Sequence, residues 1–341
     1  MYNFETFLQS VRKSKSSPGE EINYNMGPSP NELEEIYNSG YCGVIPDRAA
    51  YYSLRTLAPR FYNVYPEAKG RGKGKASMPF KAALTLDKEF GGYESQTTGD
   101  CVSHSTRNAG MMDYCIDSLF GETKFKGRLA TENIYGARGH AGQGANCSRL
   151  AEYVSQNGDG GFLPRDNYIT DDGVVDLTVY DSQLGHLWGR RGTPRWLNKI
   201  ASENKALRVF SLKSVEEMID ALAMGFGITM CSGYGFSSTR NSDGVAEKKG
   251  GWNHAMSWCG VDDTEWAHDK YGGPITLVQN SWGEWNSGGK IHDQPDGSFF
   301  IKPDVARNMI ENGGGYVIAS VRGYNRELVY DMQKYVEEIS G

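Results

Sequence analysis

Three short segments of the sequence carry residue types that can together perform acyl transfer by a thiol. They read QTTGDC at residues 96–101, WNHA at 252–255 and QNSWG at 279–283. The first leads into a helical pattern, the second opens a strand-like run and the third closes another. A nucleophile, a base and an orienting amide are therefore available, one from each segment.

Acyl transfer needs each of these groups in a defined role. Cys101 begins a helical pattern, and a thiolate is stabilised by a helix N-terminus next to an imidazolium. His254 could take the thiol proton and deliver it to the leaving amine. The Asn280 oxygen could hold the imidazole in one orientation, and Trp282 could shield that hydrogen bond from water. The Gln96 side chain and the main-chain N–H of Cys101 could face the developing oxyanion.

This combination resembles the papain-like cysteine peptidases. The order Cys, His, Asn is that of the family, and the NSWG motif at residues 280–283 is the most specific part of the match. The family places its His and Asn roughly 130–150 residues after the Cys. Here they follow by 153 and 179 residues (254 − 101 and 280 − 101), and insertions would explain the difference. The resemblance covers about residues 78–320.

The resemblance implies a fold and a set of roles. The fold would be α+β and papain-like, with two lobes: a helical N-terminal lobe and an antiparallel, β-barrel-like C-terminal lobe. Cys101, His254, Asn280 and Gln96 would take the catalytic roles described above. A glycine before a helix would pair with the substrate main chain, and the residues flanking the histidine would offer a carbonyl and line a pocket. The substrate-binding residues so implied are Gly142, Gly144, Asn253, Ala255 and Trp282.

Four departures from the family pattern bear on rate and substrate choice more than on fold. Val102 stands where the family usually has Trp, and Gln96 precedes the Cys by five residues instead of six. Thr98 occupies the region of a loop cysteine that family members usually cross-link. Asp100 places a carboxylate beside the thiol, which would raise the thiol pKa and oppose the effect of the helix terminus.

Each candidate residue also has a purely structural interpretation. Cys101 alone would more often be a buried thiol, and His254 alone an ordinary histidine. We favour catalysis because the three segments occur together in the right order. Cys147 also begins a helical pattern but lacks a companion motif, so we interpret it as structural. His104 is interpreted as a packing or surface residue, because no further metal ligands lie near it in the sequence.

The composition limits the class of protein. The chain has 341 residues, 38% of them hydrophobic, and a net charge of −6, which argues against a nucleic acid or an anionic membrane as the main ligand. No apolar run is long enough to span a bilayer, and MYNFETFLQS does not read as a secretory signal. The six cysteines are scattered without a C-x-x-C pair. We therefore expect free thiols, an intracellular or particle-associated reducing setting, and neither a metal nor a cofactor.

The pattern changes twice along the chain. Residues 1–77 are polar and are expected to form an N-terminal extension or pro-segment, residues 78–322 the peptidase domain and residues 323–341 a C-terminal helix. Residues 29–32 read as a capping box. The run KGRGKGK at 69–75 is interpreted as an exposed flexible linker, with a cleavage site or a phosphate-contacting patch as the alternative. We favour a permanent extension over a pro-segment, because the usual helical pattern of family pro-segments is missing.

Within the domain, helical patterns precede strand patterns, which favours α+β over an alternating arrangement. Ser214 and Glu217 form a capping box for one of the helices. The helices predicted here cover 101–120, 146–157 and 215–224, and the strands cover 228–231, 255–261 and 275–279.

Three functions stay open at this stage. The first is a cysteine peptidase acting on a peptide or protein substrate. The second is a related thiol amidase acting on cell-wall peptides, since such enzymes share the Cys-then-His order. The third is a catalytically weak or inactive structural protein in a larger assembly, for example a virus particle. Such a protein could contact its partner through the N-terminal extension or the C-terminal helix.

Overall fold

The computed structural model describes residues 43–45, 58–90, 94–120 and 124–321. The expected capping box at 29–32 and the expected C-terminal helix at 323–341 lie outside the described residues. Within the described ranges, no helix has the length and apolar character needed to cross a membrane.

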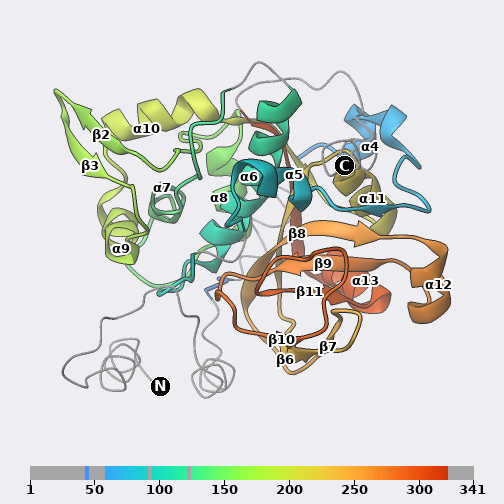
Figure 1. Ribbon diagram of the computed structural model, residues 1–341. Helices are drawn as coiled ribbons and strands as arrows, with labels where there is room; N and C mark the ends of the chain where they lie inside the picture. Colours follow the sequence, from blue (N-terminus) through green and yellow to red (C-terminus); the bar gives the residue numbers. More distant parts are fainter. Residues whose placement is uncertain (1–42, 46–57, 91–93, 121–123, 322–341) are drawn as a thin grey trace, which may run out of the picture.

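An open antiparallel sheet forms the half of the molecule at the right of Figure 1. The strand order is β11–β9–β8–β5–β12–β4, and β1 pairs with the far end of β8. We expected a barrel-like lobe, but the outer strands β11 and β4 do not pair, so no closed barrel is found in the described residues. The strands are β1 (Ala76–Ser77), β4 (Ala206–Ser211), β5 (Gly227–Ser232), β8 (His254–Asp262), β9 (Ile275–Gln279), β11 (Ser298–Ile301) and β12 (Gly314–Val321).

Helices cover both faces of this sheet, so its central strands are buried on both sides. Along β8, Ala255 and Cys259 belong to the apolar cluster shared with the helix α6 (Cys101–Phe120). Met256 and Trp258 belong to the cluster on the opposite face. Side chains of a strand alternate between its faces, so a doubly covered strand reads as a continuous apolar run. This explains why the strand predictions at 228–231, 255–261 and 275–279 match β5, β8 and β9.

The second face of the sheet is covered mainly by short helices. They are α4 (Phe61–Val64), α11 (Val215–Ala223) and α13 (Pro303–Asn312), with the 3₁₀ helix η1 (Pro66–Ala68). The helix α12 (Glu265–Tyr271) connects β8 to β9. A small outer sheet contains β6 (Phe236–Arg240), β7 (Ala246–Lys248) and β10 (Ser287–Gly288). The Ser214 hydroxyl caps α11 by accepting from the N–H of Glu217, as predicted.

The left half of Figure 1 is mainly helical. It contains α7 (Glu132–Gly136), α8 (Cys147–Val154), α9 (Ser182–Arg191), α10 (Arg195–Ala201) and η2 (Ser202–Asn204), with a hairpin of β2 (Asn167–Thr170) and β3 (Gly173–Asp176). The helix α5 (Phe80–Leu86) packs on α6. The predicted helix at 146–157 is α8, which ends at Val154 because Ser155 adopts an extended backbone.

The helix α6 lies between these halves and occupies the residues predicted for it. It is buried from Cys101 to Asp117 and packs on β5, β8 and β12. Gly227 on β5 allows this approach, because a Cβ there would overlap the carbonyl oxygen of Ala109 on α6. The hydroxyls of Ser105 and Thr229 also meet across the same interface at 2.7 Å.

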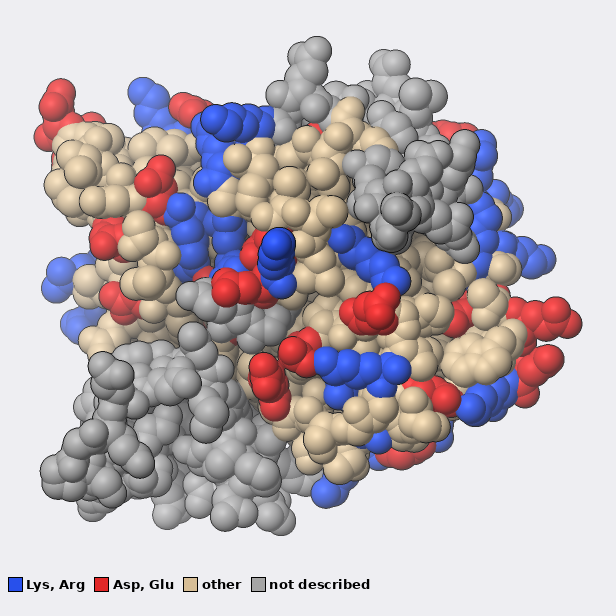
Figure 2. Space-filling model, in the orientation of Figure 1, with Lys and Arg blue, Asp and Glu red and all other residues tan. Residues whose placement is uncertain are grey.

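The basic glycine-rich loop at 69–75 is anchored, in contrast to the flexible linker that we expected. The N–H groups of its three glycines donate to the carboxylates of Asp220 and Asp263 at 2.7, 2.9 and 2.8 Å. Because the chain's own carboxylates occupy these amides, they are not available to a phosphate. Three basic side chains of the loop stay exposed: Lys69, Arg71 and Lys73. Figure 2 shows Lys and Arg side chains gathered at the right edge of the molecule.

The contact between α6 and β5 is open to a stability test. Replacing Gly227 by Ala forces a methyl group against Ala109, and overpacking of this kind costs about 1–3 kcal/mol of unfolding free energy. Gly233→Ala is the matched control, because a Cβ at Gly233 meets nothing within 4 Å. In urea unfolding, the midpoint concentration of Gly227→Ala should lie well below that of Gly233→Ala. Equal midpoints for the two variants would mean that α6 does not approach β5 so closely.

Candidate active site

Cys101 lies at the first position of α6 and is fully buried. Asp100 begins the helix, since its carbonyl accepts from the N–H groups of Ser103 and His104 at 2.9 and 3.1 Å. The main-chain N–H groups of Ala255 and Gly43 donate to the Cys101 sulfur and lower its pKa. The thiol therefore lies against the start of β8, at the residue that follows His254.

His254 is held by two of the residues that the sequence predicted. Its Nε2 lies 2.7 Å from Asn280 Oδ1, and an amide oxygen can only accept, so Nε2 carries the proton. The unprotonated Nδ1 makes no hydrogen bond within the described residues. Trp282 stacks on the imidazole, with ring centroids 4.6 Å apart and planes 27° apart. Trp252 and Trp285 complete an aromatic cluster that excludes water from this side.

Burial keeps both reacting groups neutral in this structure. Loss of solvation, together with the neighbouring Asp100 charge, raises the pKa of Cys101 to about 12; the effect of Asp100 has the direction expected from the sequence. Burial also lowers the pKa of His254 to about 4, although the Asn280 hydrogen bond opposes this shift. At neutral pH the site therefore contains a thiol and a neutral imidazole, and not the ion pair that a nucleophilic thiolate requires.

Gln96 lies in a turn that leads to Cys101. Its main-chain N–H donates to the Ser281 carbonyl at 2.8 Å, and its side-chain oxygen accepts from the Ser281 hydroxyl at 2.5 Å. One N–H of its amide donates to the Thr98 carbonyl at 2.9 Å. An amide has two such N–H bonds, so the second is left for an oxyanion. The turn is thereby connected to the strand end that carries Asn280.

The segment 43–45 lies beside this site and is held by main-chain hydrogen bonds. Val44 donates its N–H to the Asn253 carbonyl at 3.0 Å, and Ile45 donates to the Ala145 carbonyl at 2.9 Å. Ala145 in turn donates to the Gly43 carbonyl at 2.7 Å, so the segment runs parallel to the chain at Ala145. These contacts use main-chain groups next to or within the residues predicted to bind substrate.

The predicted substrate-binding residues are only partly brought together. Gly144 is buried with a φ of +80°, and its lack of a side chain lets the Gly43 carbonyl approach. Asn253 and Ala255 flank His254 and contact Val44 and Cys101 as described above. Gly142 is exposed and turned away, with its carbonyl accepting from Arg138 Nε at 3.0 Å. Trp282 contacts His254 rather than the segment.

Three further residues of the site were missed by the sequence reasoning. Gln143 accepts through Oε1 from the Thr98 hydroxyl and the Gly99 N–H at 2.6 and 2.8 Å. Ser281 holds Gln96, and its place inside the NSWG motif was the one available signal. Tyr180 donates to Asp100 from a segment 80 residues along the chain, with no local signal in the sequence.

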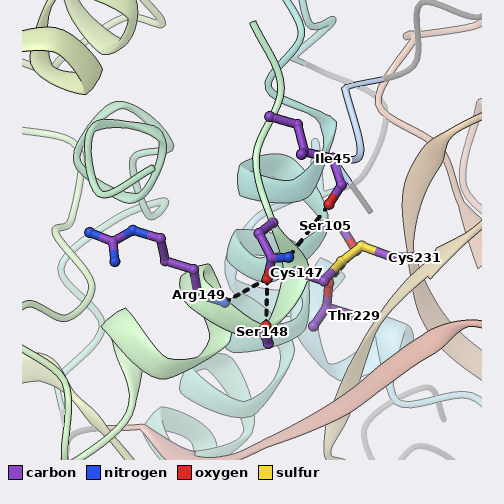
Figure 3. The surroundings of a disulfide bond; sticks show 8 residues. Ile45, Ser105, Cys147, Ser148, Arg149, Thr229 and Cys231 are labelled. Carbon is purple, nitrogen blue, oxygen red and sulfur yellow. Dashed lines mark hydrogen bonds between the residues drawn. A yellow bond between two sulfur atoms is a disulfide. The ribbon is translucent and has the colours of Figure 1, made fainter. Parts of the chain in front are cut away.

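Cys147 and Cys231 form a disulfide, which corrects the expectation of free thiols (Figure 3). They are 84 residues apart, and packing of the first turn of α8 on β5 brings their Cα atoms to 6.4 Å, within the range of a disulfide. Asn146 caps α8 by accepting from the N–H of Arg149 at 3.1 Å, and it also approaches Ile45. The disulfide thus connects residues 145–147, which contact segment 43–45, to strand β5 of the sheet. The other cysteines in the described residues, Cys101, Cys115 and Cys259, are free.

No protein-family model and no curated protein matches this sequence, whereas solved structures do. Xylellain, a cysteine protease from Xylella fastidiosa, is 14% identical over 90% of this chain and 100% of that chain, with a TM-score of 0.47. Digestive procathepsin L2 proteinase from the Tenebrio molitor larval midgut is 15% identical over 93% and 89%, with a TM-score of 0.49. The bromelain protease from Ananas comosus is 14% identical over 67% and 95%, with a TM-score of 0.39. We therefore argue the function from the site's own geometry.

The buried neutral histidine makes stability fall in acid. Unfolded His254 takes a proton below about pH 6.5, whereas in the fold it does so only near the folded pKa of about 4. Its contribution is complete above pH 6.5 and is lost as the pH falls toward 4, by about 3 kcal/mol in all. His254→Gln should therefore flatten the pH dependence of urea unfolding over this range. His268→Gln, at a ring that is half exposed, is the control and should keep the wild-type slope. Parallel curves for His254→Gln and wild type would contradict the burial of this imidazole.

Proposed function

We propose that this chain is a cysteine peptidase whose described form is latent. The observation that carries the proposal is the placement of His254, whose ring is fixed by Asn280 and Trp282 and whose neighbour in the chain, Ala255, directs its N–H at the Cys101 sulfur. This arrangement supports one reaction class, acyl transfer through a thiol. The substrate is a peptide or protein that binds along the cleft now filled by residues 43–45.

The proposed reaction follows from these positions. His254 Nδ1 takes the proton of Cys101, and the sulfur attacks a peptide carbonyl carbon. The resulting oxyanion accepts from the Cys101 N–H and from the free N–H of the Gln96 amide. The imidazolium then protonates the leaving amine, the carbon–nitrogen bond breaks and an acyl-enzyme forms. Water, deprotonated by His254, releases the acyl group and restores the thiol.

Latency follows from how segment 43–45 meets the sulfur. Gly43 directs its N–H at Cys101 and its carbonyl at the N–H of Ala145, so the Gly43 carbonyl is not presented to the thiol. The segment also removes the site from water, which keeps Cys101 and His254 uncharged. Displacement of the segment would admit water and substrate together.

Displacing the segment should therefore activate the enzyme. Gly43→Val places a side chain against the Gly99 carbonyl, where even a Cβ has no room, and should expel the segment. Three main-chain hydrogen bonds of about 1 kcal/mol each are at stake, so hydrolysis of a labelled casein should rise by about tenfold or more. Val44→Ala keeps every main-chain bond and is the control. Equal rates for the two variants would contradict latency by this segment.

The identity of the nucleophile has its own test. In the Gly43→Val chain, a peptide epoxide should label a single cysteine, and Cys101→Ala should abolish the labelling. Cys259→Ala removes another buried free thiol and should leave the labelling intact. Persistent labelling without Cys101 would remove it from this role. Loss of turbidity from a peptidoglycan suspension, with casein untouched, would favour the cell-wall amidase instead.

A further inference from the structure

The hydroxyl of Tyr180 closes the turn over residues 96–101. It donates to Asp100 Oδ2 at 2.7 Å and accepts from the Thr97 N–H at 3.3 Å. One hydroxyl therefore connects the residue after the predicted oxyanion donor with the residue before the predicted nucleophile. Burial and the Asp100 carboxylate raise the pKa of Tyr180 well above its usual range, so the phenol keeps its proton and stays a donor.

Asp100 is a buried carboxylate that is only partly satisfied. It is 1% exposed, and its Oδ1 has no hydrogen-bond partner among the described residues. Its Oδ2 accepts from Tyr180 and lies 3.4 Å from His104 Nε2. A buried acceptor without a partner costs free energy, and this charge also opposes a thiolate at Cys101. A residue with both disadvantages is expected where a site needs it, rather than where stability does.

The His104 ring lies beside the Asp100 carboxylate. The ring is fully buried and meets Tyr180 edge to face, with centroids 5.1 Å apart. Its Nδ1 lies 3.3 Å from Arg107 Nη2, and a guanidinium can only donate, so Nδ1 accepts. Its Nε2 approaches Asp100 Oδ2 to 3.4 Å without forming a hydrogen bond among the described residues. Arg107 is paired with Glu94 at 3.1 Å. These contacts thus connect Tyr180, through Asp100, His104 and Arg107, to Glu94 in the segment that leads into the turn.

We propose that Tyr180 is a positioning residue of the peptidase site. Its hydroxyl holds the turn so that the Gln96 amide and the Cys101 N–H face the same carbonyl oxygen, with Asp100 and His104 as its anchor. The inference rests on the peptidase function proposed above. The turn is one residue shorter than the family pattern, and no disulfide crosses it in the described residues, so hydrogen bonds must supply the constraint.

The test replaces Tyr180 by Phe in the full-length Gly43→Val chain, which removes the hydroxyl and keeps the ring against His104. Turnover of a labelled peptide should lose about 10- to 100-fold in kcat with KM changed by less than about threefold, because the oxyanion exists only in the transition state. Alkylation of Cys101 by iodoacetamide needs no oxyanion donor and should change by less than about threefold. Tyr168→Phe is the matched control, since it removes a 2.6 Å hydroxyl bond to the Pro164 carbonyl outside the turn.

A second pair of variants tests Asp100, the carboxylate that accepts from the Tyr180 hydroxyl. Asp100→Ala should lose kcat as Tyr180→Phe does, and Asp100→Asn, which keeps an acceptor oxygen for the phenol, should recover most of it. A kcat for Tyr180→Phe within about twofold of its parent, or an equal loss of kcat and alkylation, overturns the positioning role.

Hydrogen exchange at the Thr97 amide separates this inference from the peptidase function. Slow exchange in the parent and fast exchange in Tyr180→Phe is the expected result. If the Gly43→Val parent hydrolyses peptide but its Thr97 amide exchanges fast, only the positioning role of Tyr180 is overturned. Slow exchange in a parent without any turnover contradicts the peptidase function, and the catalytic role of Tyr180 falls with it.

Discussion

The packing of α6 against β8 and β5 is the contact on which the rest of the site depends. It brings Cys101, at the start of a helix, to the N–H of Ala255, at the start of a strand. Gly227 permits this distance by lacking a side chain. Because His254 precedes Ala255 and Asn280 directly follows the neighbouring strand β9, the sheet register sets the remaining geometry.

The same burial that positions the thiol and the imidazole also removes their charges. A pKa near 12 for Cys101 and near 4 for His254 describes a site whose two groups are uncharged. Under the function proposed above, segment 43–45 maintains this state, and its main-chain hydrogen bonds hold it at the site. Activity would then be controlled by access of water to one buried pair, because hydration alone would bring both pKa values toward their ordinary range.

The features that could be predicted from the sequence are those that a local residue pattern encodes. The helix from Cys101, the three buried strands and the pairing of His254 with Asn280 follow from periodicity and from the NSWG motif. Residues whose partners are distant in sequence were not predictable, as with Tyr180 and Asp100 or with Cys147 and Cys231. The loop at 69–75 was misjudged for a related reason, since Asp220 and Asp263 lie far along the chain. Composition shows that a loop is basic and glycine-rich, but not that carboxylates anchor it.

The most direct test of a latent thiol–imidazole pair is intact-mass alkylation by iodoacetamide from pH 4 to 9, with peptide mapping of the modified cysteine. The wild-type chain should stay unreactive at Cys101 over this whole range, because burial raises the pKa of its thiol to about 12. The Gly43→Val chain should react at Cys101 well below pH 7, and adding His254→Ala should abolish that reactivity. Profiles that coincide in all three proteins would contradict the account, because neither the segment nor the histidine would then control the thiol.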